Sequence, residues 1–208
     1  MSEIGNISWN ANIERYFAQT GEKANALSIL HKDSESIYSK RRTFIDLPVI
    51  VISGVTGFLS VGSSTMFSDA MATSVALGLA SLLVSVLNTV GTYFSWAKRS
   101  EQHRISSIQY SRLYRFLSVE MGLPRNERMS PPDLLKYTKE AYDRLQEISP
   151  LVPEEIIKAN KKKFEKYDSI ALPEEMNGLV KVIIQQNALP PNKSLLEIRS
   201  PTMTANDG

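Results

Sequence analysis

Two long stretches without a charged side chain constrain this chain more than any other feature of its sequence. They cover residues 47–68 and 70–97, which are 22 and 28 residues long, and only Asp69 separates them. A helix on the surface of a water-soluble domain needs a polar face. A helix that crosses the hydrocarbon core of a bilayer needs about 20 mainly apolar residues in a row. The pattern therefore predicts an all-α membrane protein built on a two-helix transmembrane hairpin.

The expected hairpin covers residues 44–96, with spans at about 44–63 and 71–96 and a short turn, 64–70, between them. A buried helical hairpin inside a water-soluble protein is the alternative interpretation. Basic clusters lie just outside both spans, and a soluble core gives no reason for them, whereas a membrane does. The membrane interpretation is therefore favoured.

The flanking charges predict how the hairpin is oriented. Lysine and arginine residues stand before the first span and after the second, whereas the turn between the spans carries one acid and no base. By the positive-inside rule, both termini of this multi-pass membrane protein are expected to be cytoplasmic. The residues expected at the membrane interface, including aromatic side chains typical of an interfacial belt, are Lys40, Arg41, Arg42, Tyr93, Trp96, Lys98 and Arg99.

Each span carries a stripe of small and mostly hydroxyl-bearing residues. The spacing within each stripe alternates between four and three, so its members share one face of a helix. We call these two sets the small-residue stripes. They are Ser53, Gly57, Ser60 and Ser64 in the first span, and Ser74, Gly78, Ser81, Ser85, Asn88 and Thr92 in the second.

Two interpretations of the stripes stay open. Small residues let transmembrane helices approach closely and their hydroxyl groups bond across the contact, so the stripes form either the internal seam of the hairpin or a seam between copies. Alternatively, several copies turn the stripes toward a central axis and line a pore. Asn88 is the most informative single residue, because an amide at membrane depth needs a partner. Neither span holds a charged residue deep inside, so a pore of this kind is expected to be wide or weakly selective.

The polar segments on either side of the hairpin predict a cytoplasmic helical bundle. Residues 1–43 are expected to form N-terminal cytoplasmic helices, with a break between two of them at 20–23. Residues 97–186 are expected to form further cytoplasmic helices. Residues 187–208, rich in proline and small polar residues, predict a flexible tail.

The helices after the hairpin follow from proline positions and apolar spacing. One is expected at 96–121, and a second opens at Ser130 with proline in its first turn. A third covers 154–167, and a fourth, Pro173–Gln186, is amphipathic. The fourth packs either on its own bundle or on a neighbouring subunit.

The sequence holds no pattern typical of catalysis. A net charge of +2 is too small to argue for nucleic-acid binding, and the absence of cysteine excludes disulfides, thiolate metal sites and a cysteine nucleophile. The two histidines, His31 and His103, lack metal-ligand spacing to another ligand, and metalloprotease and phosphate-loop motifs are missing. We therefore expect a non-enzyme without cofactor, metal or nucleic-acid partner.

The order of helices and of certain residues resembles a known family. That order is Trp9, Leu30-His31 and Tyr38, then two close spans, and then Lys98-Arg99, His103, Tyr110 and Leu113. Over residues 9–165 the chain resembles the SLATT domain, a two-transmembrane effector domain of bacterial conflict systems that is also found in large DNA viruses.

The resemblance implies a membrane effector that oligomerises to form a pore or to perturb the membrane under the control of a separate partner. The expected partners are the lipid bilayer, further copies of the chain, and a separate regulatory or sensor protein. The alternative is a non-conducting structural or scaffolding membrane protein, in a virus for example, that anchors a cytoplasmic helical bundle.

Overall fold

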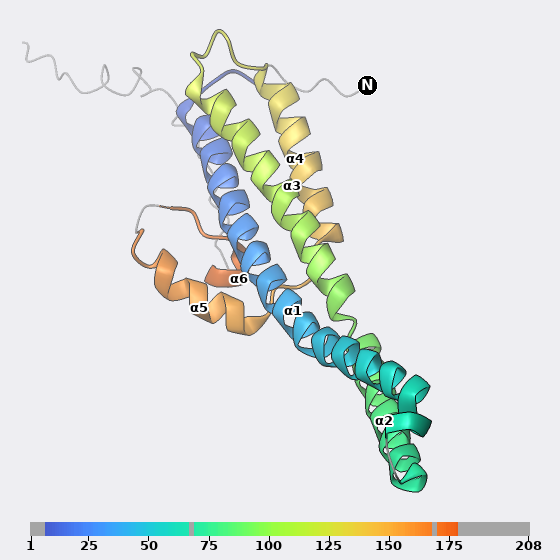
Figure 1. Cartoon of the computed structure of the whole chain (residues 1–208). Coiled ribbons are helices and arrows are strands. Elements are labelled where there is room, and N and C mark those ends of the chain that lie inside the picture. The colour runs from blue at the N-terminus through green and yellow to red at the C-terminus, as the bar shows by residue number, and fades with distance from the viewer. Residues whose placement is uncertain (1–6, 67–68, 168–169, 179–208) are drawn as a thin grey trace, which may run out of the picture. The chain divides into compact units, whose positions relative to one another are not determined.

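A computed structural model describes residues 7–66, 69–167 and 170–178 of the chain, and in these residues all regular structure is helical. The helices are α1 (Ala11–Met66), α2 (Ala70–Phe94), α3 (Trp96–Gly122), α4 (Pro131–Ile148), α5 (Glu154–Phe164) and α6 (Glu174–Asn177) (Figure 1). By length and composition, α1 and the helix that follows it each hold an apolar stretch long enough to cross a membrane. The expectation of an all-α fold is thus confirmed for the described residues.

Helix α1 is continuous over 56 residues and joins the N-terminal bundle segment to the first apolar stretch. The break expected at 20–23 is wrong. Thr20 donates its hydroxyl hydrogen bond to the carbonyl of Tyr16 inside the helix, at 2.8 Å. A Cβ atom built on Gly21 would lie 3.6 Å from the Cβ atom of Leu117 in α3. Close packing on α3 therefore keeps this glycine helical, since tertiary contacts outweigh its low helix propensity.

Helices α2 and α3 are separate helices that meet at Ser95. Ser95 has φ 51° and ψ 37°, the left-handed conformation, which is uncommon for a residue with a side chain. At the other end of α2, the Asp69 carboxylate accepts hydrogen bonds from the backbone N–H groups of Met71 and Ala72 at 3.0 and 3.1 Å. The one acid between the two uncharged runs is therefore the N-cap of α2.

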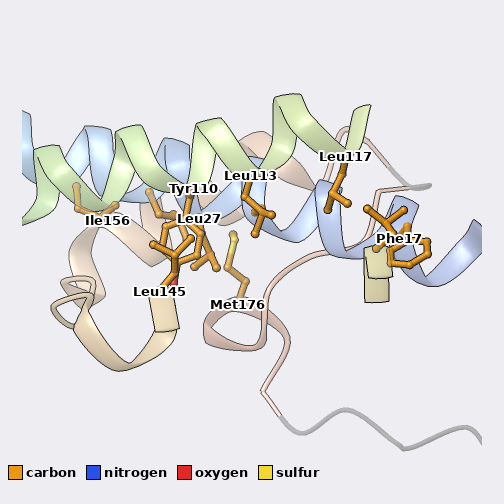
Figure 2. Close-up of a cluster of buried hydrophobic side chains, with 11 residues drawn as sticks. Phe17, Leu27, Tyr110, Leu113, Leu117, Leu145, Ile156 and Met176 are labelled. Atoms are coloured by element: carbon orange, nitrogen blue, oxygen red, sulfur yellow. The ribbon is translucent and has the colours of Figure 1, made fainter. Parts of the chain in front are cut away.

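The bundle core lies between the N-terminal part of α1 and α3, with α4, α5 and α6 packed around them (Figure 2). Its apolar residues come from all five helices, and each is nearly inaccessible to solvent. They are Phe17, Ala24, Leu27 and Leu30 of α1, Tyr110, Leu113 and Leu117 of α3, Leu134 and Leu145 of α4, Ile156 of α5, and Met176 of α6.

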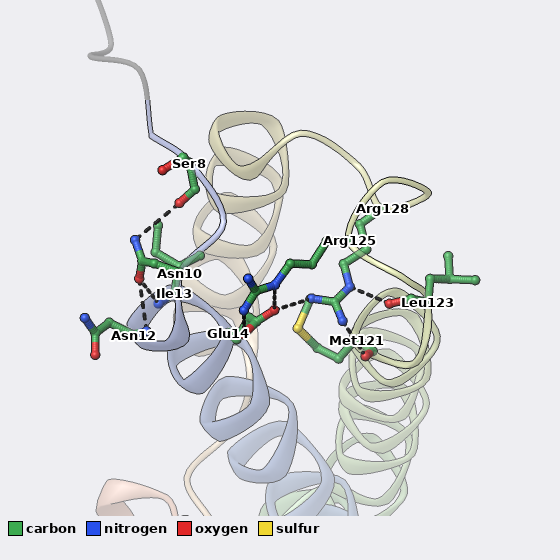
Figure 3. Close-up of polar contacts among 9 residues, drawn as sticks. All are labelled: Ser8, Asn10, Asn12, Ile13, Glu14, Met121, Leu123, Arg125 and Arg128. Carbon is green, nitrogen blue, oxygen red and sulfur yellow. Dashed lines mark hydrogen bonds and ion pairs between the residues drawn. The ribbon is translucent and has the colours of Figure 1, made fainter.

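Glu14 ties the loop after α3 to the first turn of α1 (Figure 3). Its carboxylate accepts from Arg125 at 2.8 Å and from Arg128 at 2.7 Å. Arg128 also donates to the carbonyls of Met121 and Leu123, at 3.1 and 2.7 Å, which lie at the C-terminal end of α3 and otherwise lack helical partners. One half-buried guanidinium, that of Arg128, thus caps the end of α3 and pairs with α1.

The later helices begin as expected, and the last one is shorter. Ser130 accepts from the N–H of Asp133 at the start of α4, next to proline in the first turn. The single helix expected over Pro173–Gln186 begins as expected but is wrong in its length, because α6 ends at Asn177 and Gly178 follows with φ 67°. Residues 179–186, like the expected tail at 187–208, lie outside the described residues.

Candidate functional site

The two helices of the hairpin, α1 and α2, meet along a seam of half-buried residues spaced alternately by four and three. The seam residues are Ile45, Val49, Ile52, Thr56 and Leu59 of α1, and Thr73, Leu77, Ala80, Val84, Leu87 and Gly91 of α2. A Cβ atom built on Gly91 would lie 3.5 Å from Cγ2 of Ile45, so the helices approach closely at this end. This spacing is the one that two helices need to stay in contact over several turns.

The small-residue stripes are not this seam. Each stripe residue other than Ser64 follows a seam residue by one position and is exposed: Ser53, Gly57, Ser60, Ser74, Gly78, Ser81, Ser85, Asn88 and Thr92. The side chain of Ser64, in the last turns of α1, lies outside the described part. The internal seam is therefore made by other residues, and a seam between copies and a pore lining stay predictions for the stripes.

Both stripes lie on the same side of the hairpin. One residue further along a helix turns the side chain by about 100°. Helices α1 and α2 are antiparallel neighbours (Figure 1). The same one-residue shift therefore turns the stripe of α1 and the stripe of α2 in opposite senses about their helix axes, so both stripes face one common side of the hairpin. We call it the polar side of the hairpin.

A cavity at the end of the hairpin next to the bundle confirms this arrangement. The cavity, of about 370 Å³, brings Asp46 of α1 together with Asn88 and Thr92 of α2. Arg42 and Lys98 also line it, and the Arg42 guanidinium binds the Asp46 carboxylate at 2.9 Å. Charged groups therefore surround the point at which the polar side meets the bundle.

A second hollow, of about 650 Å³, continues from this cavity along α2. Ser81, Ser85, Asn88 and Thr92 line it together with Thr89. The Thr89 hydroxyl donates to the carbonyl of Ser85 at 2.9 Å, so this hydroxyl is satisfied within its own helix. The side-chain amide of Asn88 is the group of this hollow with the largest hydrogen-bonding capacity.

The opposite side of the hairpin is apolar. A groove of about 490 Å³ runs between α1 and α2 there, lined by residues that precede the seam by one position, such as Val51, Val55, Ala72 and Ala76. The hairpin therefore has two chemically different sides, one bearing hydroxyl and amide groups and the other mostly hydrocarbon, with the seam residues Thr56 and Thr73 at the floor of its groove.

The residues expected at the membrane interface gather where the hairpin meets the bundle. Lys40, Arg41, Arg42, Tyr93, Lys98 and Arg99 are exposed, and Trp96 is half-buried. The Trp96 ring stacks on Phe94 with centroids 5.1 Å apart. Arg41 binds Glu155 of α5 at 2.7 Å, and both Arg41 and Arg99 place their guanidinium groups over the ring of Tyr38, at 5.8 and 5.9 Å. This basic belt is thereby attached to the bundle.

Sequence reasoning missed one feature, which is a buried contact between the two histidines. Nδ1 of His31 on α1 lies 2.8 Å from Nδ1 of His103 on α3, and the two side chains are 2% and 1% exposed. The sequence shows only that neither histidine has a metal-ligand partner nearby in the chain. Their positions on the buried faces of two helices were the available signal, but a pairing across 72 residues does not follow from spacing.

No metal site accompanies this pair. Within residues 7–66, 69–167 and 170–178, no group of three or more histidine or carboxylate side chains is placed to hold a metal ion. Comparison of the chain with protein-family models, curated proteins and solved structures finds no match.

Proposed function

We propose that this chain is a membrane effector whose hairpin spans a bilayer with both termini on the cytoplasmic side. Several copies assemble with their polar sides turned toward one another, and the assembly forms a pore or perturbs the membrane. The single observation that carries the proposal is the exposure of a continuous polar side, with Asn88 in it, on a hairpin that is otherwise apolar.

Exposed hydrocarbon on the hairpin supports the membrane location. Phe44, Val61 and Met71 are 78%, 88% and 80% exposed. The most apolar stretch of α1 has 6% of its residues buried, and that of α2 has none. Water-soluble proteins rarely expose so large an apolar surface, whereas hydrocarbon tails solvate it without cost. The basic residues at the bundle end of both helices support the orientation.

The polar side supports assembly. A side-chain amide that faces lipid at the depth of Asn88 lacks the hydrogen-bond partners that water would give it, and this is costly. A second copy placed against the same side supplies partners, and the stripe glycines and serines permit a close approach. A Cβ atom built on Gly57 or Gly78 meets nothing within 4 Å, so space for a neighbour is present at both positions.

A pore lined by the stripes would have hydroxyl and amide walls. No charged residue lies between Asp46 and Asp69 or between Asp69 and Lys98, so selection among ions by charge would be confined to the two ends. The resemblance to the SLATT domain also supports a membrane effector that forms a pore or perturbs the membrane. In this function a separate regulatory or sensor protein would control the assembly.

A non-conducting scaffold is the second candidate, and a groove on the bundle favours it. The groove, of about 490 Å³, lies between α3 and α4. Tyr137 and Ile148 line it and are 43% and 54% exposed. Exposed aromatic and aliphatic side chains in a groove are typical of surfaces that bind a protein partner. In this function the hairpin only anchors the bundle.

Release of dye and ions from liposomes that contain the purified protein separates the two functions. We expect release by the wild type and weaker release by Asn88→Leu. Val86→Leu is the matched control, because Val86 is also exposed on α2 but precedes the seam residue Leu87 by one position and so lies on the apolar side of the hairpin. Intact liposomes with folded, inserted wild-type protein would favour the scaffold or an effector that awaits its partner.

A further inference from the structure

The histidine contact joins the two long helices of the bundle through a single proton. At 2.8 Å, Nδ1 of His31 and Nδ1 of His103 are at hydrogen-bond distance. A neutral imidazole has one N–H donor and one acceptor nitrogen, so one ring donates to the other, and the accepting Nδ1 carries no proton. Protonation of the accepting nitrogen replaces the hydrogen bond with two facing N–H groups.

Two tyrosine rings enclose the pair. Tyr38 stacks on His103 with centroids 5.4 Å apart and planes 15° apart, and Tyr110 stacks on His31 at 5.5 Å and 12°. The rings exclude water from both imidazoles, and they fix the two imidazoles in contact. The environment therefore favours two uncharged rings over an imidazolium ion.

The charged groups around the pair offer a proton no counter-ion. On α3, Arg99 acts on His103 with a like charge, and on α1, Arg41 lies with Arg99 over the outer ring, Tyr38. The carboxylates nearby have other partners: Asp33 of α1 is bound by Asn160 and Lys163 of α5, Glu101 of α3 by Arg104, and Glu155 of α5 by Arg41. The charge of Glu35 of α1 acts on Arg104.

Further titratable groups come from α4 and α6, and the charge of Glu175 of α6 acts on Tyr110. Tyr142 packs on Tyr110 at 6.3 Å, and burial raises the pKa of both phenols, that of Tyr110 to about 12. Both rings are therefore uncharged in the acid range. In the part of the chain that the structure describes, neither imidazole forms an ion pair with a carboxylate.

We propose that the His31–His103 pair is a proton-operated latch between α1 and α3, closed while the accepting ring is neutral and opened when acid protonates both rings. The latch is independent of the proposed function, but its position suits control of the hairpin. His31 lies about 20 Å along α1 from the expected start of the first span, and His103 lies about 10 Å along α3 from Ser95. Separation of α1 from α3 at the pair therefore acts on both helices that enter the hairpin.

The direction of the response follows from the pKa of each ring. Burial first, and then the neighbouring imidazole for His31 and Arg99 for His103, together lower the pKa of each ring from 6.5 to about 4. In an opened state the rings regain water and a pKa near 6.5. The opened state then binds more protons between pH 6.5 and about 4, so acid favours opening in this range and the latch is closed above it.

Distance measurement between two spin labels tests the latch in the full chain. The sequence has no cysteine, so Ser36→Cys on α1 and Gln102→Cys on α3, both exposed positions near the pair, give two unique labels. At pH 7.5 we expect one narrow distance distribution in nanodiscs by electron paramagnetic resonance. Between pH 6.5 and 4 a longer component should grow, and it should disappear again when the pH is raised.

The double variant His31→Gln/His103→Gln is the control, because glutamine donates and accepts hydrogen bonds but does not titrate. We expect its distances to stay constant over the whole range. An unchanged wild-type distribution down to pH 4 would overturn the proposal, as would an identical change in the variant, which would assign the response to carboxylates. If the variant differs from the wild type at pH 7.5, the imidazole resonances of the wild type decide instead: midpoints well below 6.5 support the latch, and midpoints near 6.5 overturn it.

Discussion

Asp46 and Asn88 lie on different helices of the hairpin and line one cavity. The first follows the seam residue Ile45 and the second follows the seam residue Leu87, so each marks the side of its helix that carries the small-residue stripe. Their meeting shows that the two stripes share one side. The spacing of the small-residue stripes is also compatible with an internal seam, but in the structure the stripes form an outward surface that a second copy can cover.

Loss of the Asn88 amide should weaken self-association. In a detergent micelle or bilayer we expect Asn88→Leu to raise the monomer fraction, by an amount that corresponds to about 0.6–2 kcal/mol for a hydrogen bond between helices. Asn88→Gln, which keeps the amide, should restore most of the association. Native mass spectrometry of the three proteins measures it, and equal oligomer distributions would argue against contact through the polar side.

Removal of the Glu14 carboxylate should destabilise the bundle and change its response to acid. Arg125 and Arg128 lower the pKa of Glu14 from 4.5 to about 2. The unfolded chain therefore binds the extra proton between pH 4.5 and about 2, so the stabilisation from Glu14 is present above pH 4.5 and is lost as the pH falls to 2.

Glu14→Gln should accordingly lower the Tm at neutral pH and reduce the loss of Tm below pH 4.5. Glu101→Gln is the control, because Glu101 pairs only locally with Arg104 on its own helix and such exposed pairs contribute little. Thermal unfolding followed by circular dichroism gives both values. A larger effect at Glu101 than at Glu14 would contradict the assignment.

Gly21→Ala should stabilise the bundle. The built Cβ atom lies 3.6 Å from Leu117, which is ordinary van der Waals contact, and the backbone there is helical. Alanine is therefore accommodated, and it improves helix propensity by about 1 kcal/mol. Chemical unfolding of both proteins measures the gain. A loss of stability would mean that α1 and α3 lie closer together than this distance.

The two apolar helices and the start of α4 follow from the sequence, because a single local rule decides each of them. Uncharged runs of span length fix the two apolar helices, and the serine-proline start of α4 follows from capping and from the free first N–H groups of a helix. The break expected at 20–23 failed because contact with Leu117 outweighs the local preference of glycine.

The sequence predicts which residues form each small-residue stripe, but it does not predict which way the stripe faces. Helical spacing groups each stripe on one face, but the direction of that face depends on which neighbouring residues make the seam, and Val, Ile, Leu, Ala and Thr compete closely with Ser and Gly for that role. The histidine pair depends on the register of α3 against α1, a contact over 72 residues, which no local pattern sets.

Disulfide cross-linking between copies in a bilayer tests the central claim most directly. The chain lacks cysteine, so Ser81→Cys places one thiol on the polar side, and Leu82→Cys places one at nearly the same depth on the outer face of α2. Both positions are exposed in one copy of the chain. We predict that mild oxidation links Ser81→Cys into dimers and leaves Leu82→Cys largely monomeric. Equal cross-linking of both variants, or dimers from Leu82→Cys alone, would contradict assembly through the polar side.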